Sequence, residues 1–259
     1  LVTFGFGHKV PFRILGAGVK RISSTRMEKS FERGLYYVDV PGLSIGVGDE
    51  GGFAPQIGSN KKALRALAES VRAAGFKLKK DFALGIDAAA SEFYDDEKEI
   101  YRFAADRKNY KPASVYKLYE KWIHEYGLRI IEDGCSEDDF TGWQKLTANL
   151  GGRTVLVGDD LFVTNTQRIE SGIIAGVANA VLIKPNQIGT LTETVAAIKL
   201  AQKYGYQVVI SHRSGETLDD FIADLAVAVS ADYIKAGSLS RGERLAKYNR
   251  LLEIEKELK

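Results

Sequence analysis

The chain has 259 residues, 45% of them hydrophobic, and 36 basic against 34 acidic residues give a net charge of +2. This length supports one large α/β domain with a full core. The near balance of charge implies neither a nucleic acid nor an anionic membrane as a partner. The single Cys135 excludes an intramolecular disulfide and fits a reducing compartment, and no apolar run approaches the roughly 20 residues of a membrane span.

The first 46 residues have the weakest pattern. Apolar runs at 10–15 and 36–40, each followed by glycine or proline, indicate two strands, and a short helix is expected in the second half of 20–32. Residues 47–55 form an acidic loop with paired glycines, where the backbone can approach a ligand closely. A loop without function is the alternative for 47–55.

From residue 60 onward, helical and strand patterns alternate about every 25 residues. Helices are expected at 60–75, 114–125, 140–150, 165–171, 190–204, 217–229 and from 241 to the end. Strands are expected at 83–87, 128–133, 154–160, 180–184, 207–210 and 231–235, and 91–107 is expected to be an irregular charged insertion. Such repeated units indicate a parallel sheet, and we expect an α/β fold with a (β/α)8 TIM-like barrel whose first strands, from residues 1–47, are irregular.

Ionisable side chains stand at the ends of the six expected strands. The run 180–183 is wholly apolar and leads directly into Lys184, which has no packing reason to be there. The full set is Asp87, Glu132, Asp159, Lys184, His212 with Arg213, and Lys235. Each alone has an ordinary explanation as a solvated or salt-bridged residue, but strand ends in a barrel converge on one mouth, where catalysis takes place.

The chemistry of this mouth is divided between its two sides. Asp87, Glu132 and Asp159 form a hard, oxygen-only set suited to Mg²⁺, without the thiolates or imidazoles that favour zinc. The cationic residues on the later strands would face an anionic substrate, most simply a carboxylate or a phosphate.

Several ordered motifs together resemble the enolase (phosphopyruvate hydratase) family. They are 47–55 (VGDEGGFAP), 85–87 with 91–94, 131–133, 158–161, 182–189 (LIKPNQIG), 211–217 (SHRSGET) and 244–249 (RLAKYN). By this resemblance, residues 1–259 are one enolase-type C-terminal barrel domain, divergent over 1–46 and closely similar to the family over 47–259.

The resemblance implies a cytoplasmic, Mg²⁺-dependent lyase that dehydrates 2-phosphoglycerate to phosphoenolpyruvate in glycolysis or gluconeogenesis. It assigns Lys184 as the base at C2 and Glu50 as the acid that assists loss of the C3 hydroxide. It assigns His212, Arg213 and Ser214 to the phosphate, Lys235 to the carboxylate, and Asp87, Glu132 and Asp159 to the metal. Sites of the enolase superfamily are a known example of a lysine or histidine base that works beside Mg²⁺. A homodimer or larger homo-oligomer is left open, and surface display rests on family analogy alone.

Some family features are not recognisable in this sequence. The family has an N-terminal domain whose mobile serine loop ligates a second Mg²⁺, and a glutamate that assists Glu50; neither can be assigned here. A degenerate barrel that binds a ligand or a partner protein without turnover is therefore an alternative, and a superfamily enzyme for another carboxylate is a third. Cys135 is expected to be structural, and the charged closing helix is expected to be a solvated surface.

Overall fold

The computed structural model describes residues 3–5 and 46–259 of the chain. The two strands expected at 10–15 and 36–40 and the short helix within 20–32 lie outside these residues. Among the described residues, no helix is long and apolar enough to cross a membrane.

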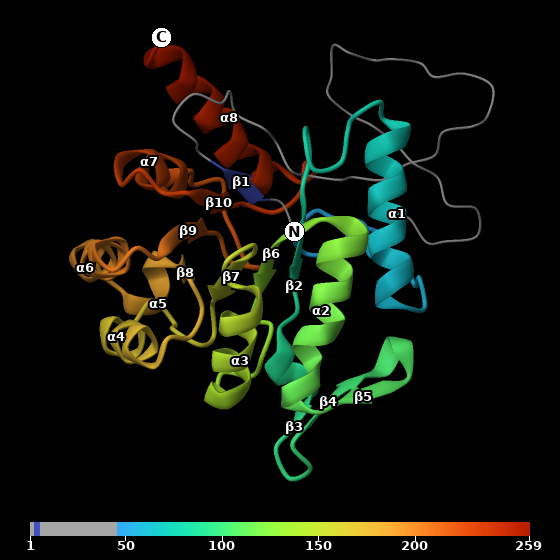
Figure 1. Cartoon of the computed structure of the whole chain (residues 1–259). Coiled ribbons are helices and arrows are strands. Elements are labelled where there is room, and N and C mark those ends of the chain that lie inside the picture. The colour runs from blue at the N-terminus through green and yellow to red at the C-terminus, as the bar shows by residue number, and fades with distance from the viewer. Residues whose placement is uncertain (1–2, 6–45) are drawn as a thin grey trace, which may run out of the picture.

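Six parallel strands form a curled sheet in the described part of the chain, and a short seventh strand is added antiparallel at one edge. In sequence these strands are β1 (Thr3–Gly5), β2 (Leu84–Asp87), β6 (Leu128–Glu132), β7 (Val155–Gly158), β8 (Ala180–Ile183), β9 (Gln207–Ser211) and β10 (Tyr233–Lys235). The spatial order is β1-β10-β9-β8-β7-β6-β2. This topology confirms the predicted α/β, TIM-like fold, and Figure 1 shows the sheet curling around a common axis.

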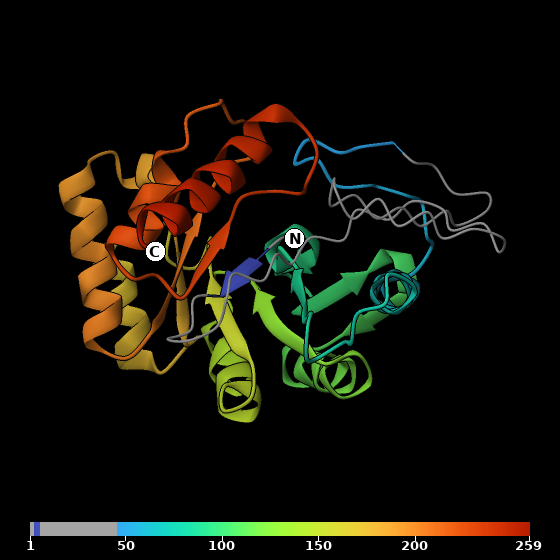
Figure 2. The same ribbon diagram turned by 90° about the horizontal axis from the view of Figure 1, so that it is seen from above.

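Helices lie around the outside of the curled sheet, as Figure 2 shows from above. They are α1 (Asn60–Ala73), α2 (Pro112–Tyr126), α3 (Phe140–Leu150), α4 (Thr166–Ala175), α6 (Leu191–Lys203), α7 (Phe221–Ala228) and α8 (Gly242–Glu257). Local signals in the sequence set several of their starts. Ser59 and Asn165 accept backbone N–H groups at the first turns of α1 and α4, and Thr190 caps α6 in the same way.

The segment 91–107 differs from its prediction as an irregular insertion. It contributes to a small antiparallel sheet with strands β3 (Tyr94–Asp95), β4 (Ile100–Phe103) and β5 (Lys108–Tyr110). The short helix η1 (Ala90–Phe93) precedes β3, and η2 (Ala104–Asp106) connects β4 to β5. A further short helix, α5 (Pro185–Ile188), was also not expected. These elements have few residues each, so they carry too little periodic pattern to be recognised from sequence.

The core has two layers that follow the alternation of side chains along each strand. The larger layer lies between sheet and helices and includes Ile131, Leu156 and Val181. A smaller cluster fills the concave face, and its members are Ile130, Val155, Val157, Ala180, Leu182 and Val209. Inward-facing residues stacked in layers are the expected interior of a TIM-type barrel.

Candidate active site

The candidate site continues the inner layer of the sheet toward the ends of the strands. Side chains on a strand alternate between its faces, so residues two positions apart share a face. Glu132, Asp159 and Lys184 each follow a member of the inner apolar cluster by two positions. The strands therefore place these ionisable groups on the concave side, directly above the apolar layer.

A cavity of about 480 Å³ opens at this end of the sheet. Its lining comprises Glu50, Asp87, Asp159, Asp160, Lys184, Asn186, Ser211, His212, Arg213, Ser214, Gly215 and Lys235. Eight of the nine residues predicted from sequence are in this lining. The ninth, Glu132, is 2% exposed and bonded to a lining residue, Lys235.

A larger cavity of about 740 Å³ lies elsewhere, between α1, α2 and the segment 105–110. Its cations, such as Lys108 and Lys117, are exposed surface residues. Size alone does not identify a site, whereas convergent polar groups in a cavity do. The 480 Å³ cavity is therefore the candidate active site.

Lys235 connects two of the predicted metal ligands. Its Nζ donates to Glu132 Oε1 at 2.7 Å and to Asp87 Oδ2 at 2.9 Å. Burial alone would lower the pKa of Lys235, but the two carboxylates raise it overall, so this side chain is a cation. Burial raises the pKa of Glu132 despite the opposing effect of Lys235. The ammonium group therefore provides the positive charge that these two acids need.

Asp159 and Lys184 form a second ion pair on the rim of the cavity. Lys184 Nζ lies 2.5 Å from Asp159 Oδ2, and both side chains are largely buried. The other oxygen, Asp159 Oδ1, is buried without a hydrogen-bond partner in the described residues. A buried carboxylate oxygen without a partner is costly unless something else binds it.

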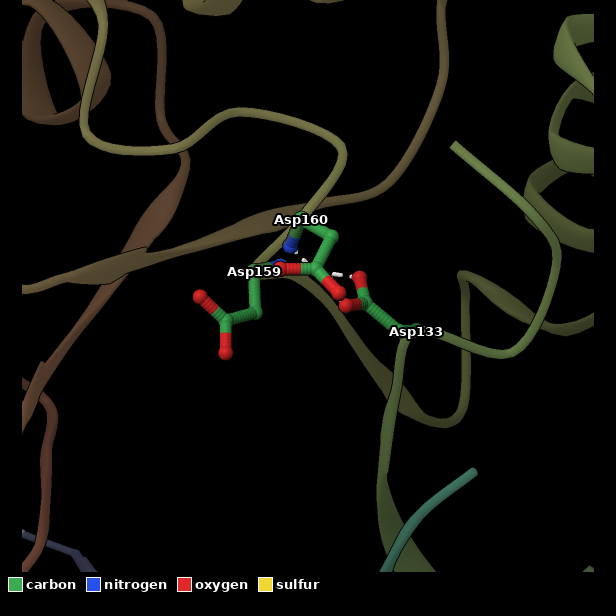
Figure 3. A group of neighbouring side chains, drawn as sticks. All are labelled: Asp133, Asp159 and Asp160. Carbon is green, nitrogen blue, oxygen red and sulfur yellow. Dashed lines mark hydrogen bonds between the residues drawn. The ribbon is translucent and has the colours of Figure 1, made fainter. Parts of the chain in front are cut away.

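Asp133 connects the ends of β6 and β7. Its Oδ1 accepts the backbone N–H of Asp159 and its Oδ2 that of Asp160, both at 2.9 Å (Figure 3). Burial raises the pKa of Asp133 to about 7, although these two N–H groups act in the opposite direction. The backbone of Asp133 has a positive φ of 40°, which is uncommon for a residue other than glycine.

The tightest carboxylate group in the described residues is not the predicted one. Ligand atoms of Asp133, Asp159 and Asp160 lie within 4.8 Å of one another. Asp87 and Glu132 instead approach each other around Lys235. Because both Asp133 oxygens already accept backbone N–H groups, we assign Asp133 a structural role at this rim.

The residues fit a hard divalent cation. The donors on this rim are carboxylate oxygens, which Mg²⁺ prefers, and Asp159 offers a buried oxygen with no other partner among the described residues. For Asp87, Glu132 and Asp159 to hold such an ion, as the sequence predicts, Lys235 and Lys184 would have to release their carboxylates.

Glu50 lies across the cavity, in the acidic loop predicted at 47–55. The loop is fixed to the segment after β10: Glu50 O accepts Ser238 N at 2.8 Å, and Gly51 O accepts the Ser240 hydroxyl at 2.7 Å. Gly51 has φ of +78°, and a Cβ there would lie 2.3 Å from Ser240 O. Only glycine therefore permits this close approach.

The Glu50 carboxylate faces the residues after β9. Its Oε1 accepts the Ser214 hydroxyl at 3.1 Å, and its Oε2 lies 3.4 Å from His212 Nε2. Contact with His212, supported by Lys235 and Ser214, lowers the pKa of Glu50 to about 2, although burial opposes this shift. Glu50 is therefore ionised at neutral pH in the free protein.

Arg244 is a residue of this site that sequence reasoning did not identify. Its guanidinium donates to Arg213 O at 2.8 Å, to Ser214 O at 2.6 Å and to Asp49 O at 2.8 Å. Through Arg244, α8 therefore connects the loop after β9 to the acidic loop at 47–55. Arg244 and Lys247 are each 1% exposed. The prediction that the charged closing helix is a solvated surface is therefore wrong for this face of α8.

Cys135 is buried, and burial raises the pKa of its thiol, in agreement with the structural role expected for it.

A comparison with known protein families identifies a match over most of the chain. Residues 39–259 match the family described as enolase, C-terminal TIM barrel domain. The match extends over the whole strand-end array and over α8.

Proposed function

Because the chain belongs to the family of enolase C-terminal TIM barrel domains, we propose that it is a lyase that dehydrates 2-phosphoglycerate to phosphoenolpyruvate with Mg²⁺. The observation that carries the proposal is the array of ionisable residues in the candidate active site. Lys184, Arg213 and Lys235 line the cavity together with the acids. Lys184 and Lys235 are ion-paired with the predicted metal ligands, so acids and cations are interleaved and the division into two sides expected from sequence is wrong. A substrate with a carboxylate and a phosphate group complements these cations.

Removal of the C2 proton is assigned to Lys184. A proton next to a carboxylate is very weakly acidic, so the resulting dianion needs positive charge placed in advance. Mg²⁺ on the acidic rim would supply part of this charge when bound. Lys235 supplies more, from a buried position that fixes its direction. Lys184 must also be neutral to accept the proton, which requires that its contact with Asp159 be relieved.

Phosphate binding is assigned to His212, Arg213 and Ser214. Arg213 Nη1 lies 3.3 Å from Asn186 Oδ1, so its guanidinium extends along the rim toward α5. Glu50 beside these residues is the proposed acid. Its carboxylate is ionised in the free protein, so an anionic substrate nearby must raise its pKa before it can donate a proton.

Isotope exchange separates the two roles. Lys184→Ala should abolish exchange of the C2 proton of 2-phosphoglycerate with solvent, whereas Glu50→Gln should keep this exchange and lose dehydration. The reason is that base and acid act on different bonds. Exchange is measured by NMR in D₂O, and phosphoenolpyruvate formation is followed with and without Mg²⁺.

The same assays, together with calorimetry, separate the proposed enzyme from the alternative of a barrel that binds a ligand without turnover. A chain that binds 2-phosphoglycerate in calorimetry but shows neither exchange nor turnover with Mg²⁺ would be a binding module. Equal loss of both activities in both variants would contradict the separate roles of Lys184 and Glu50. Lys199→Met, on the exposed side of α6, serves as the control for a lost lysine.

A further inference from the structure

The contact between Arg244 and His212 defines the protonation of the histidine ring. Arg244 Nη1 lies 2.6 Å from His212 Nδ1, and both side chains are buried. A guanidinium has only N–H donors and stays protonated, so it cannot accept a hydrogen bond. His212 Nδ1 must therefore be the acceptor, without a proton.

The other ring nitrogen then carries the proton of the neutral ring. His212 Nε2 is buried, has no hydrogen-bond partner in the described residues and lies 3.4 Å from Glu50 Oε2. His212 also lines the candidate active site. An N–H in this position is available to an oxygen atom that enters the cavity.

Burial of the ring, rather than the charged groups around it, favours the same state. Arg244 from α8 and Lys235 from β10 disfavour a positive charge on His212, whereas Glu50 from the acidic loop favours one. Burial is the largest influence, and overall the pKa of His212 is lowered from its ordinary value. The neutral ring therefore prevails at pH 7.

We propose that Arg244 is a positioning residue that locks His212 as the neutral Nε2–H tautomer, so that His212 serves the site as a hydrogen-bond donor and not as a cation. The kinetic part of this inference rests on the proposed function. The tautomer itself does not, because it follows from the contact with Arg244.

Such a donor would act beside Glu50, either on the C3 oxygen that leaves the substrate or on the substrate phosphate. A neutral N–H can stabilise negative charge that develops on an oxygen. A cationic imidazolium would also neutralise the charge of Glu50, whereas the neutral ring does not. Arg244 also holds Ser214 O and Asp49 O, so the ring, the phosphate loop and the acidic loop share one anchor.

The tautomer is measured directly by ¹⁵N NMR of the imidazole. The chain has three histidines, so the double variant H8Q/H124Q leaves His212 alone. At pH 7 we expect a pyridine-type signal for Nδ1 and a pyrrole-type signal for Nε2. The opposite pattern, or a doubly protonated ring, overturns the proposal whatever the activity of the chain.

Substitution of Arg244 in the same background tests its part. Arg244→Met should raise the pKa of His212 and mix its tautomers, and it should lower kcat about 10²-fold, a typical effect of losing one preorganised group. Arg244→Lys keeps a side chain that can donate a hydrogen bond to His212 Nδ1 but cannot accept one. This variant should therefore retain more of the Nε2–H form of His212 than Arg244→Met. A folded Arg244→Met chain with an unchanged ¹⁵N pattern and titration overturns the role of Arg244.

The wild-type NMR measurement remains decisive if Arg244→Met does not fold. Absent turnover together with the expected ¹⁵N pattern would contradict the proposed function and leave the tautomer assignment standing.

Discussion

At the scale of single residues, lysine ammonium groups neutralise the carboxylates that are the predicted metal ligands. The ammonium of Lys235 lies between Asp87 and Glu132, and that of Lys184 lies against Asp159. Each predicted metal ligand is thus paired with a lysine that the proposed reaction uses. Removing one partner of a buried pair is costly because the other charge remains buried without compensation.

Lys235→Met should therefore make the protein depend on Mg²⁺ for stability. Without the ion, the free energy of unfolding should fall by about 3–5 kcal/mol, since Glu132 and Asp87 then lack a cation. Added Mg²⁺ should raise the Tm of this variant more than that of the wild type, because ligand binding to the native state stabilises it. Thermal denaturation with EDTA or Mg²⁺ measures both effects.

Lys199→Met is again the control and should show neither effect. Equal Mg²⁺ responses of wild type and Lys235→Met would contradict the metal assignment.

At the scale of elements, the small sheet β3-β4-β5 is tied to the loop after β6. Tyr101 on β4 is fully buried; its hydroxyl donates to Asp139 Oδ2 at 2.6 Å and accepts Ser136 N at 3.0 Å. Asp139 Oδ1 in turn accepts Gly142 N at the start of α3. One hydroxyl thus connects the sheet, the loop that follows Glu132 and a helix.

Tyr101→Phe should destabilise the protein by about 1–3 kcal/mol, because the buried Ser136 N–H loses its acceptor. Urea denaturation measures this as a lower midpoint with an unchanged slope. Tyr110→Phe is the matched control: Tyr110 is half-buried on β5 and packs edge-on against Phe103, a contact that the substitution keeps. Similar midpoints for the two variants would show that the Tyr101 hydroxyl does not hold these elements together.

The sequence predicted the long elements well and the short ones poorly. The order of strands and helices followed from apolar runs, such as 180–183, and from helical periodicity, such as that of 60–75. The strand ends then followed from parallel topology, since the carboxyl ends of parallel strands meet on one side. The segment 91–107 did not show its strands because they are short. Arg244 and Lys247 were missed because a buried cation cannot be distinguished from a solvated one without its partners.

At the scale of the whole molecule, the native state depends on charges that acid removes. Lys247 of α8 is buried and donates to Glu216 Oε2 at 2.9 Å and to Thr217 O at 2.6 Å. Burial alone would raise the pKa of Glu216, but the contact with Lys247 lowers it overall. A lowered carboxyl pKa stabilises the fold above the pKa of the unfolded chain, and this stabilisation is lost as the pH falls through the folded-state pKa.

Glu216→Gln should therefore lower the free energy of unfolding at pH 7 by about 1.5–3 kcal/mol, the range for hydrogen bonds to charged groups. The difference from wild type should shrink as the pH falls below about 4.5, the ordinary value for glutamate. Urea denaturation across this pH range measures it. Glu253→Gln, at an exposed ion pair on α8, should change stability little at any pH. A Glu216→Gln difference that persists unchanged at acid pH would contradict the linkage.

The position of Asp133 imposes a severe restriction on which amino acids can occupy it. The residue must accept two backbone N–H groups at once, reach them with a short side chain and tolerate a left-handed backbone. Glycine satisfies the backbone alone, asparagine would present an NH₂ to one of the two N–H groups, and glutamate is one methylene too long. Aspartate alone meets all three demands. Divergence in this barrel is therefore closed at the residue that joins two of its strands.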